Sequence, residues 1–291
     1  MLPYLLLLLS ILLTVSKSAI YNLFAKRSAP SLSVTFLFNT VAYGSAAAIA
    51  VLAVILGGKA SLSLSTALCA LLYAVIVLSL QTVSIAAMRV GAMATTSICV
   101  MYGMIIPSLA GPIFWREPFG ILQGAGILLM VISLWLLTDR SSGGSATKKW
   151  WLLAVPAFLL SGMAGLAEKI HQSTNGREEK PVFVLVACLL MALISAVAAT
   201  VTGKREHTKS PLRAVLSTAS PAGIVIGVYS IVNLTLAGTL NSMIYYPVAN
   251  GGAMILTVIV SMVCFKEATD RRKLTGIALG LVGILCLSLP V

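Results

Sequence analysis

The residue whose type and position point most directly to chemistry is Lys17, which lies inside an apolar stretch at residues 2–24. Charge is costly in the hydrocarbon of a bilayer, so an ionisable residue at such a depth indicates a binding or coupling role. Polar residues recur around it at spacings of three and four, which places them on one face of a helix. We expect this stripe to line a cavity or meet a polar partner; the alternative is a lysine that snorkels to the membrane surface. The stripe comprises Ser10, Thr14, Lys17, Ser18, Tyr21 and Asn22.

A second charge, Glu168, lies near the end of another apolar stretch, on the same helical face as Ser161. It could be the counter-ion of Lys17, or it could carry protons. The alternative is an interfacial charge on a solvated helix end, because Arg177 and Glu178 follow closely.

Polar and aromatic residues near the centres of other apolar stretches form a third candidate group. Tyrosines at this depth do not form an interfacial belt. They are suited to stacking on a ligand and forming hydrogen bonds with it, although for each of them ordinary helix packing is the alternative. The group consists of Gln81, Tyr102, Tyr229, Asn233, Tyr245, Tyr246 and Asn250.

Catalytic and metal-binding patterns are missing from the apolar stretches. The two histidines, His171 and His207, lie at or beyond their ends, and Asp139 and Asp270 lie in connections. No Ser/His pair, H-E-x-x-H or P-loop occurs, and no two of the five cysteines form a C-x-x-C pair. We therefore expect neither a membrane enzyme nor an ATP-driven pump, and no cofactor or metal.

The elements that must position these residues follow from composition. Of 291 residues, 59% are hydrophobic and 10% are charged, against about 25% charged in ordinary soluble domains. This excludes a plain cytosolic enzyme, a disordered chain and a disulfide-rich secreted module. We predict an all-α membrane protein with ten transmembrane helices of roughly 20 residues each. The apolar windows are about 2–24, 32–56, 62–88, 91–115, 119–138, 150–170, 181–202, 212–238, 241–265 and 273–290.

Two further patterns concern the helices themselves. Gly223 and Gly227, four residues apart, predict a close helix–helix contact. Prolines inside windows are candidate breaks or kinks, such as the hinges that alternating access would need. They are Pro107, Pro221 and Pro247.

The net charge of +12 comes from 20 Lys and Arg, all of which except Lys17 lie between or beside the windows. On a soluble domain such a charge would suggest nucleic acid. Here it indicates basic loops that fix orientation in a lipid bilayer, and we expect no nucleic-acid partner.

The chain also matches itself at a constant offset of 150 residues. Trp-Arg-Glu at 115–117 falls on Phe-Lys-Glu at 265–267, and Gly126 falls on Gly276. A polar Gly/Ser linker, 139–149, separates a first five-helix repeat (1–138) from a second (150–291). With an odd number of helices in each half, the second half enters the membrane upside down, which predicts two inverted five-helix repeats.

The segments 117–126 and 267–276 resemble the end signature of EamA-type repeats, which belong to the drug/metabolite transporter superfamily. The second copy departs from the signature, with Ala268 where the first has Pro118. The first residues resemble the start of small multidrug resistance proteins, a four-helix branch of that superfamily. This chain has Thr14 where that branch carries a membrane glutamate.

The resemblance implies a secondary transporter of the cell membrane. The expected function is alternating-access movement of a small metabolite, amino acid or drug-like solute, often exported, with Glu168 as the candidate for proton coupling. Alternatives are a transporter of nucleotide- or lipid-linked sugar, or a membrane accessory subunit without transport. We expect a monomer or a homodimer.

Orientation is predicted from the distribution of Lys and Arg. Most lie in the connections after the first, third, fifth, seventh and ninth helices, few lie in the others, and none lies at the termini. Because basic loops are retained in the cytoplasm, both termini should lie on the extracytoplasmic side. The EamA resemblance implies cytoplasmic termini and a basic tail, which residues 288–291 lack. We follow the charge distribution.

Overall fold

A computed structural model describes residues 2–57, 61–115, 119–137, 147–174, 179–206, 212–239, 242–266 and 270–289. Regular structure in these ranges is entirely helical, which confirms the all-α class. The segments are α1 (Leu2–Arg27), α2 (Leu32–Gly57), α3 (Leu64–Val90), α4 (Met93–Met101), the 3₁₀ turn η1 (Tyr102–Met104), α5 (Ile105–Trp115), α6 (Ile121–Leu137), α7 (Lys148–Thr174), α8 (Lys180–Glu206), α9 (Leu212–Thr239), α10 (Ser242–Phe265) and α11 (Arg271–Ser288).

Each predicted apolar window coincides, within a few residues, with one of these segments. The window 91–115 is divided into α4, η1 and α5. If these three count as one, the described residues form ten helical segments. Seven stretches in the described residues are long and apolar enough to cross a membrane. Shorter apolar stretches in the described residues are Ile121–Leu136 of α6 and Ala249–Phe265 of α10, and α11 begins with three basic residues.

Large apolar side chains cover the outside of the bundle. Examples are Leu56, Ile121 and Leu152, which are 87%, 93% and 75% exposed. In water such a surface would be unstable, whereas lipid tails solvate it well. The chain is therefore an integral membrane protein with several spans whose perimeter contacts the bilayer.

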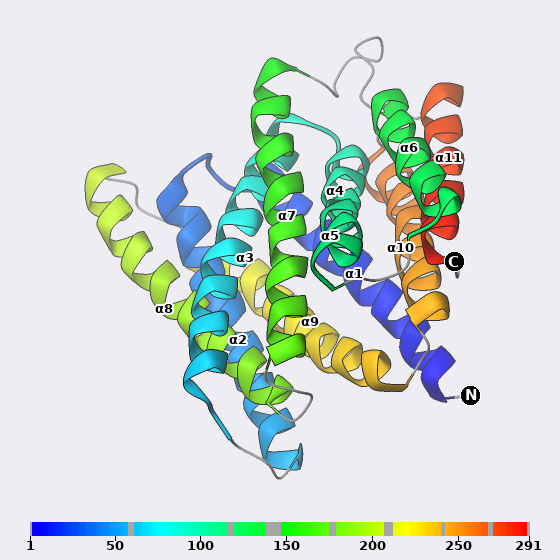
Figure 1. The fold of residues 1–291 in the computed structure, drawn as a ribbon. Coiled ribbons are helices and arrows are strands. Elements are labelled where there is room, and N and C mark those ends of the chain that lie inside the picture. The colour runs from blue at the N-terminus through cyan, green and yellow to red at the C-terminus, as the bar shows by residue number, and fades with distance from the viewer. Residues whose placement is uncertain are drawn as a thin grey trace.

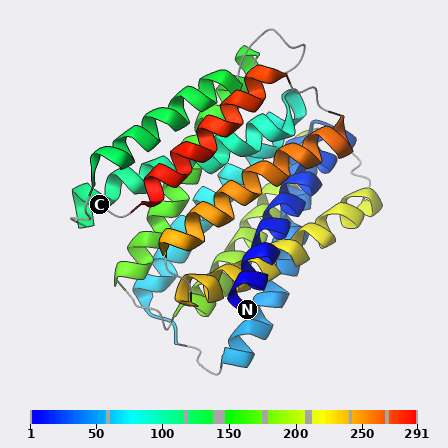
Figure 2. The ribbon, with the colours of Figure 1, turned by 90° about the vertical axis from the view of Figure 1, so that its right-hand side faces the viewer.

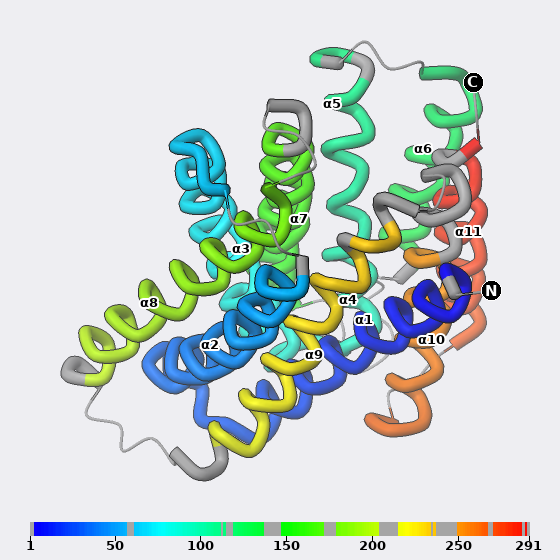
Figure 3. The backbone as a smooth tube through the Cα atoms, turned by 90° about the horizontal axis from the view of Figure 1, so that it is seen from below, coloured from blue at the N-terminus to red at the C-terminus, as the bar shows by residue number. Residues whose placement is uncertain are grey.

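The helices run side by side (Figure 2), and a pair of packed helices forms each lateral edge of the bundle. The pair α2–α8 lies at one edge and the pair α6–α11 at the opposite edge (Figures 1 and 3). Between them, α3 packs on α7, and α1 packs on both α9 and α10. Four central helices, α1, α3, α7 and α9, therefore surround the middle of the bundle.

The largest apolar cluster joins α1, α2, α3, α8 and α9. Phe24 stacks on Phe38 with ring centroids 4.1 Å apart. The close contact predicted from Gly223 and Gly227 is confirmed, because a Cβ at Gly223 would collide with the backbone of Ala42 on α2. The glycine spacing thus brings the backbones of α2 and α9 together.

The break between α4 and α5 has a local cause. Pro107 has no N–H to donate to the carbonyl of Gly103, and its ring would clash with that carbonyl in a continuous α-helix. The turn η1 lies at this point, and Gly103 packs against Ser161 of α7. By contrast, α9 and α10 continue through Pro221 and Pro247 without such a turn.

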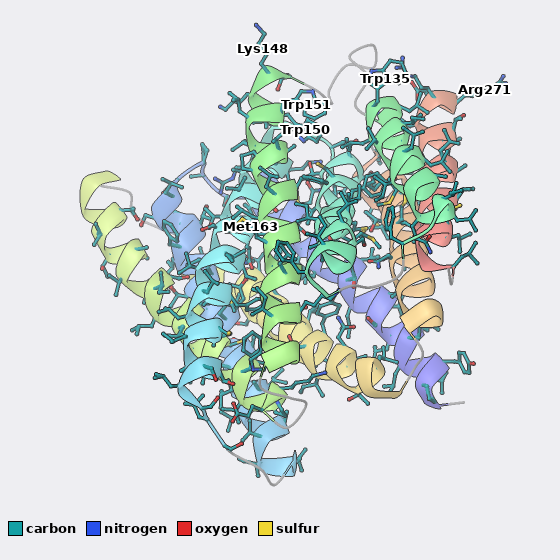
Figure 4. The ribbon with its side chains drawn as sticks, viewed as in Figure 1. Trp135, Lys148, Trp150, Trp151, Met163 and Arg271 are labelled. Carbon is teal, nitrogen blue, oxygen red and sulfur yellow. The ribbon has the colours of Figure 1, made fainter. Side chains whose placement is uncertain are left out.

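Tryptophans and basic residues gather at the end of the bundle where α6 ends and α7 and α11 begin (Figure 4). The guanidinium of Arg272 lies 4.7 Å from the ring of Trp135. Trp150 is buried and donates to Thr96 Oγ1 at 3.0 Å. Such a mixture is typical of a membrane–water interface. The side of the membrane on which this end lies stays a prediction.

Parts of the predicted repeat lie outside the described residues. These are 116–118 and 267–269, which include the glutamates of the signature, and 138–146, which form most of the linker. The boundaries 1–138, 139–149 and 150–291 therefore stay predictions, as does the inversion of the second half.

Candidate functional site

Lys17 is half-buried on α1, and its Nζ lies 4.8 Å from the centroid of the Tyr229 ring on α9. A cation over an aromatic face is held by the ring quadrupole, so the ammonium is directed toward α9. The carboxylate of Glu168 also attracts it. Among the described residues, however, no carboxylate lies close enough to Lys17 to form an ion pair.

The N-terminal part of the polar stripe, Ser10 and Thr14, joins α1 to α9 as well. Ser10 Oγ donates to Asn233 Oδ1 at 2.7 Å, which connects α1 with α9. Thr14 Oγ1 donates to the carbonyl of Ser10 at 2.9 Å, so the hydroxyl makes its hydrogen bond within α1. The predicted residues Lys17, Tyr229 and Asn233 are thus brought together.

Glu168 lies on α7 and keeps an exposed side chain. Its Oε1 accepts a hydrogen bond of 2.9 Å from the hydroxyl of Tyr73 on α3. Tyr73 was not among the predicted residues; its place inside an apolar window was the only signal for it. Each of the two charges therefore has a tyrosine on a neighbouring helix, Tyr229 for Lys17 and Tyr73 for Glu168.

These four side chains, which we call the charge site, come from the four central helices. A positive and a negative group are within electrostatic reach of each other, and Glu168 interacts more strongly with Lys180 at the start of α8 than with Lys17. Polar groups in this arrangement can bind a ligand that supplies both opposite charges.

The C-terminal part of the stripe, Ser18, Tyr21 and Asn22, lies in a different environment. Tyr21 is buried in the large apolar cluster, where it packs edge-on against Phe38 at 6.0 Å. Ser18 is buried, and Asn22 is fully buried with neither side-chain polar atom hydrogen-bonded to a residue that the structure describes. These three residues therefore do not share the contacts of Lys17.

Gln81 and Tyr102 hold helices together away from the charge site. Gln81 Nε2 donates to Asn39 Oδ1 at 2.8 Å, and Gln81 Oε1 accepts from the Tyr43 hydroxyl. Tyr102 contacts Ser133 Oγ at 2.6 Å, and Ser133 donates to the carbonyl of Gly276 on α11. Both side chains are buried and satisfied, which fits the packing alternative.

Three predicted residues lie on α10. The side chains of Tyr245 and Tyr246 lie outside the described residues. Asn250 is half-buried, on a helix that packs on α1.

A second polar cluster, missed from the sequence, lies where α3 begins, α7 ends and α8 begins. Glu179 accepts from Ser63 Oγ at 2.7 Å, from the Ser63 N–H at 3.3 Å, and from the Thr66 hydroxyl. Because Thr66 gives its proton to Glu179, His171 Nε2 is the donor in its 3.1 Å contact with Thr66 Oγ1. The His171 ring stacks on Phe183, with centroids 4.2 Å apart.

The hydrogen bonds from Thr66 and Ser63 hold the pKa of Glu179 below its usual range. Glu179 also faces the N-terminus of α3, whose first N–H groups favour a negative charge. The cluster therefore contains a carboxylate that remains ionised at neutral pH.

Comparisons with known proteins address the fold alone. No family model matches the chain, and no curated protein matches its sequence. A solved structure titled "Crystal structure of protein" is similar, with a TM-score of 0.64 over 98% of this chain and 95% of that chain, at 13% identity. The chain thus shares a complete all-helical architecture with that protein.

Proposed function

We propose that the chain is a secondary transporter that moves a small zwitterionic solute, of the amino-acid type, across the membrane by alternating access. The observation that carries this proposal is the charge site, in which Lys17 and Glu168 attract each other across neighbouring helices of a membrane bundle and each contacts a tyrosine. The EamA resemblance supports a small metabolite as cargo and export as the direction.

Charge complementarity favours a zwitterion over other solutes. A carboxylate can bind Lys17 while an ammonium binds Glu168, so that both membrane charges are neutralised in the complex. A singly charged solute can form only one of these two contacts. A nucleotide- or lipid-linked sugar would bring phosphates toward Glu168 and be repelled.

The pairing of helices supports two related halves. If the halves are exchanged, α1 corresponds to α7, α3 to α9, α2 to α8 and α6 to α11. This exchange turns the pair α1–α9 into α7–α3 and leaves the pairs α2–α8 and α6–α11 unchanged. In the structure the two helices of each of these four pairs pack against each other. Lys17 with Tyr229 joins the first pair, and Glu168 with Tyr73 joins its counterpart.

Alternating access gives this arrangement a mechanism. The solute would be held between the halves, and rocking of one half against the other would open the charge site to each side in turn. The free energies of the two open states must be similar, because a strong preference for one would stop the cycle.

The test uses purified protein in liposomes loaded with a mixture of the common amino acids and their decarboxylated amines. We expect efflux of one or a few amino acids well above that from protein-free liposomes, with their amines retained. A Lys17→Met/Glu168→Gln double variant is the matched control, because it removes both charges and keeps similar volumes. Efflux equal to that from protein-free liposomes would contradict the proposal and favour an accessory subunit.

A further inference from the structure

We propose that Ser63, Thr66, His171 and Glu179 form a latch that closes the charge site at the end of the bundle where α3 begins and α7 ends. This inference rests on the proposed transport function. It assigns a conformational role to a cluster that the charge site itself does not use.

The latch joins three helix ends on one side of the bundle (Figure 1). Ser63 precedes α3 and Thr66 lies in its first turn, His171 lies in the last turn of α7, and Glu179 immediately precedes α8. Its polar contacts are 2.7 Å for Ser63 Oγ with Glu179 and 3.1 Å for Thr66 with His171. The opposite end of α7 carries Lys148 and Trp150 (Figure 4).

The latch and the charge site are two rungs between the same helices. Glu168 and His171 are three residues apart on α7, and Tyr73 is seven residues beyond Thr66 on α3. Tyr73–Glu168 is therefore the inner rung and Thr66–His171 the outer rung, which lies about 5 to 10 Å closer to the membrane surface. Just deeper than the inner rung, Ala167 belongs to an apolar cluster with Ile76 of α3.

The outer rung has the properties of a contact that can open. It consists of hydrogen bonds at helix ends, where water can replace each partner, so each bond stabilises the closed form only modestly. The ionised Glu179 strengthens the rung and bridges α3 to the start of α8. Opening the site on this side requires α3 and α7 to separate, which breaks both rungs.

Solute binding would loosen the inner rung. An ammonium that binds Glu168 Oε1 displaces the Tyr73 hydroxyl, which donates to that oxygen in the structure. Of the inner and outer rungs between α3 and α7, only the outer rung, Thr66–His171, remains once Tyr73 is displaced. Occupation of the charge site and release of the latch are thereby coupled.

The competing interpretation is a static cap that merely stabilises the N-terminus of α3. Accessibility separates the two interpretations better than stability does. A suitable reporter is Ala167→Cys in a chain whose five native cysteines are replaced by alanine. Ala167 is 4% exposed and lies about one turn deeper than His171.

Labelling by a membrane-impermeant thiol reagent is then measured from each side of oriented vesicles. Thr66→Val removes the hydroxyl that contacts both His171 and Glu179 and keeps the side-chain volume. The matched control is Thr40→Val, whose hydroxyl donates to the Phe36 carbonyl of its own helix at 2.9 Å. We expect about tenfold faster labelling in Thr66→Val from the latch side only, which corresponds to about 1.4 kcal/mol, and no change in the control.

His171→Phe is a second variant, which keeps the stack on Phe183 and removes the donor to Thr66. Labelling of both variants at the control rate would overturn the latch, and so would faster labelling from both sides, which indicates general loosening. If the vesicles transport solute while labelling is unchanged, only the latch fails. If they transport no solute, the proposed function fails whatever the labelling shows.

Discussion

Removal of the Lys17 charge tests the recognition chemistry of the site. In Lys17→Ala the carboxylate of a zwitterion loses a charge-assisted contact, worth about 1.5–3 kcal/mol. We therefore expect its affinity to fall by roughly 10- to 100-fold, with loss of transport. The decarboxylated amine of the same solute should bind as well as before or better, because repulsion between its ammonium and Lys17 is gone.

The effect on folding should be small in comparison. The contact of Lys17 with Tyr229, at 4.8 Å, is of the kind worth about 0.5–2 kcal/mol, and relief from burying an ammonium offsets part of it. Lys17→Arg should restore little, since its planar fork has another shape. Lys26→Ala is the matched control, because Lys26 is on the same helix and lies 5.3 Å from the Phe265 ring.

Binding is measured by titration of the purified variants with the zwitterion and with its amine. The informative quantity is the ratio of the two affinities, which a general loss of folding does not change. Equal losses for both ligands, or wild-type affinity for the zwitterion, would refute the assignment of Lys17 to the carboxylate.

Four further predictions follow from other contacts. Glu168→Gln should slow transport, because the ammonium of the solute loses its carboxylate, and the remaining transport should not respond to an imposed pH gradient; identical wild-type rates with and without a gradient would remove proton coupling. The pKa of Glu179 is lowered, so its carboxylate stabilises the fold fully above the unfolded value of about 4.3 and loses this contribution as the pH falls through the lower folded pKa. The melting-temperature gap between wild type and Glu179→Gln should therefore narrow as the pH falls below about 4.3; a constant gap would oppose this. Gly223→Ala should destabilise by about 1–3 kcal/mol, since its Cβ meets the backbone of α2, whereas Gly44→Ala, with nothing within 4 Å, should not; equal thermal shifts would contradict the packing. A fluorescent protein fused after Val291 should stay dark if the positive-inside rule sets orientation; bright cells would reverse it.

Helix positions were predictable because burial in lipid demands long apolar runs, and those runs coincide with the described helices. The missing N–H of proline predicted a break at Pro107, but the same signal at Pro221 and Pro247 is not followed by a break, so the chain alone did not distinguish the three positions. Periodicity also placed Lys17 on a polar face.

Partners across the bundle were not predictable in the same way. Tyr73 and Glu168 are separated by 95 residues, and Thr66 and Glu179 by 113, so their meeting depends on how α3 packs against α7 and α8. Periodicity indicates which face a residue occupies and not which helix covers that face. For that reason the sequence places Gln81 and Tyr102 among the candidate ligand-binding residues, whereas their partners in the structure lie on other helices.

The central claim is transport of a zwitterion through the charge site, and counterflow in liposomes tests it most directly. Vesicles loaded with one unlabelled amino acid at a time are given a trace of the same labelled compound outside. We predict transient accumulation of label for at least one amino acid, its absence for the matching amine, and its absence in the Lys17→Met/Glu168→Gln variant. Accumulation of the amine to the same level, or undiminished accumulation in the double variant, would contradict the account.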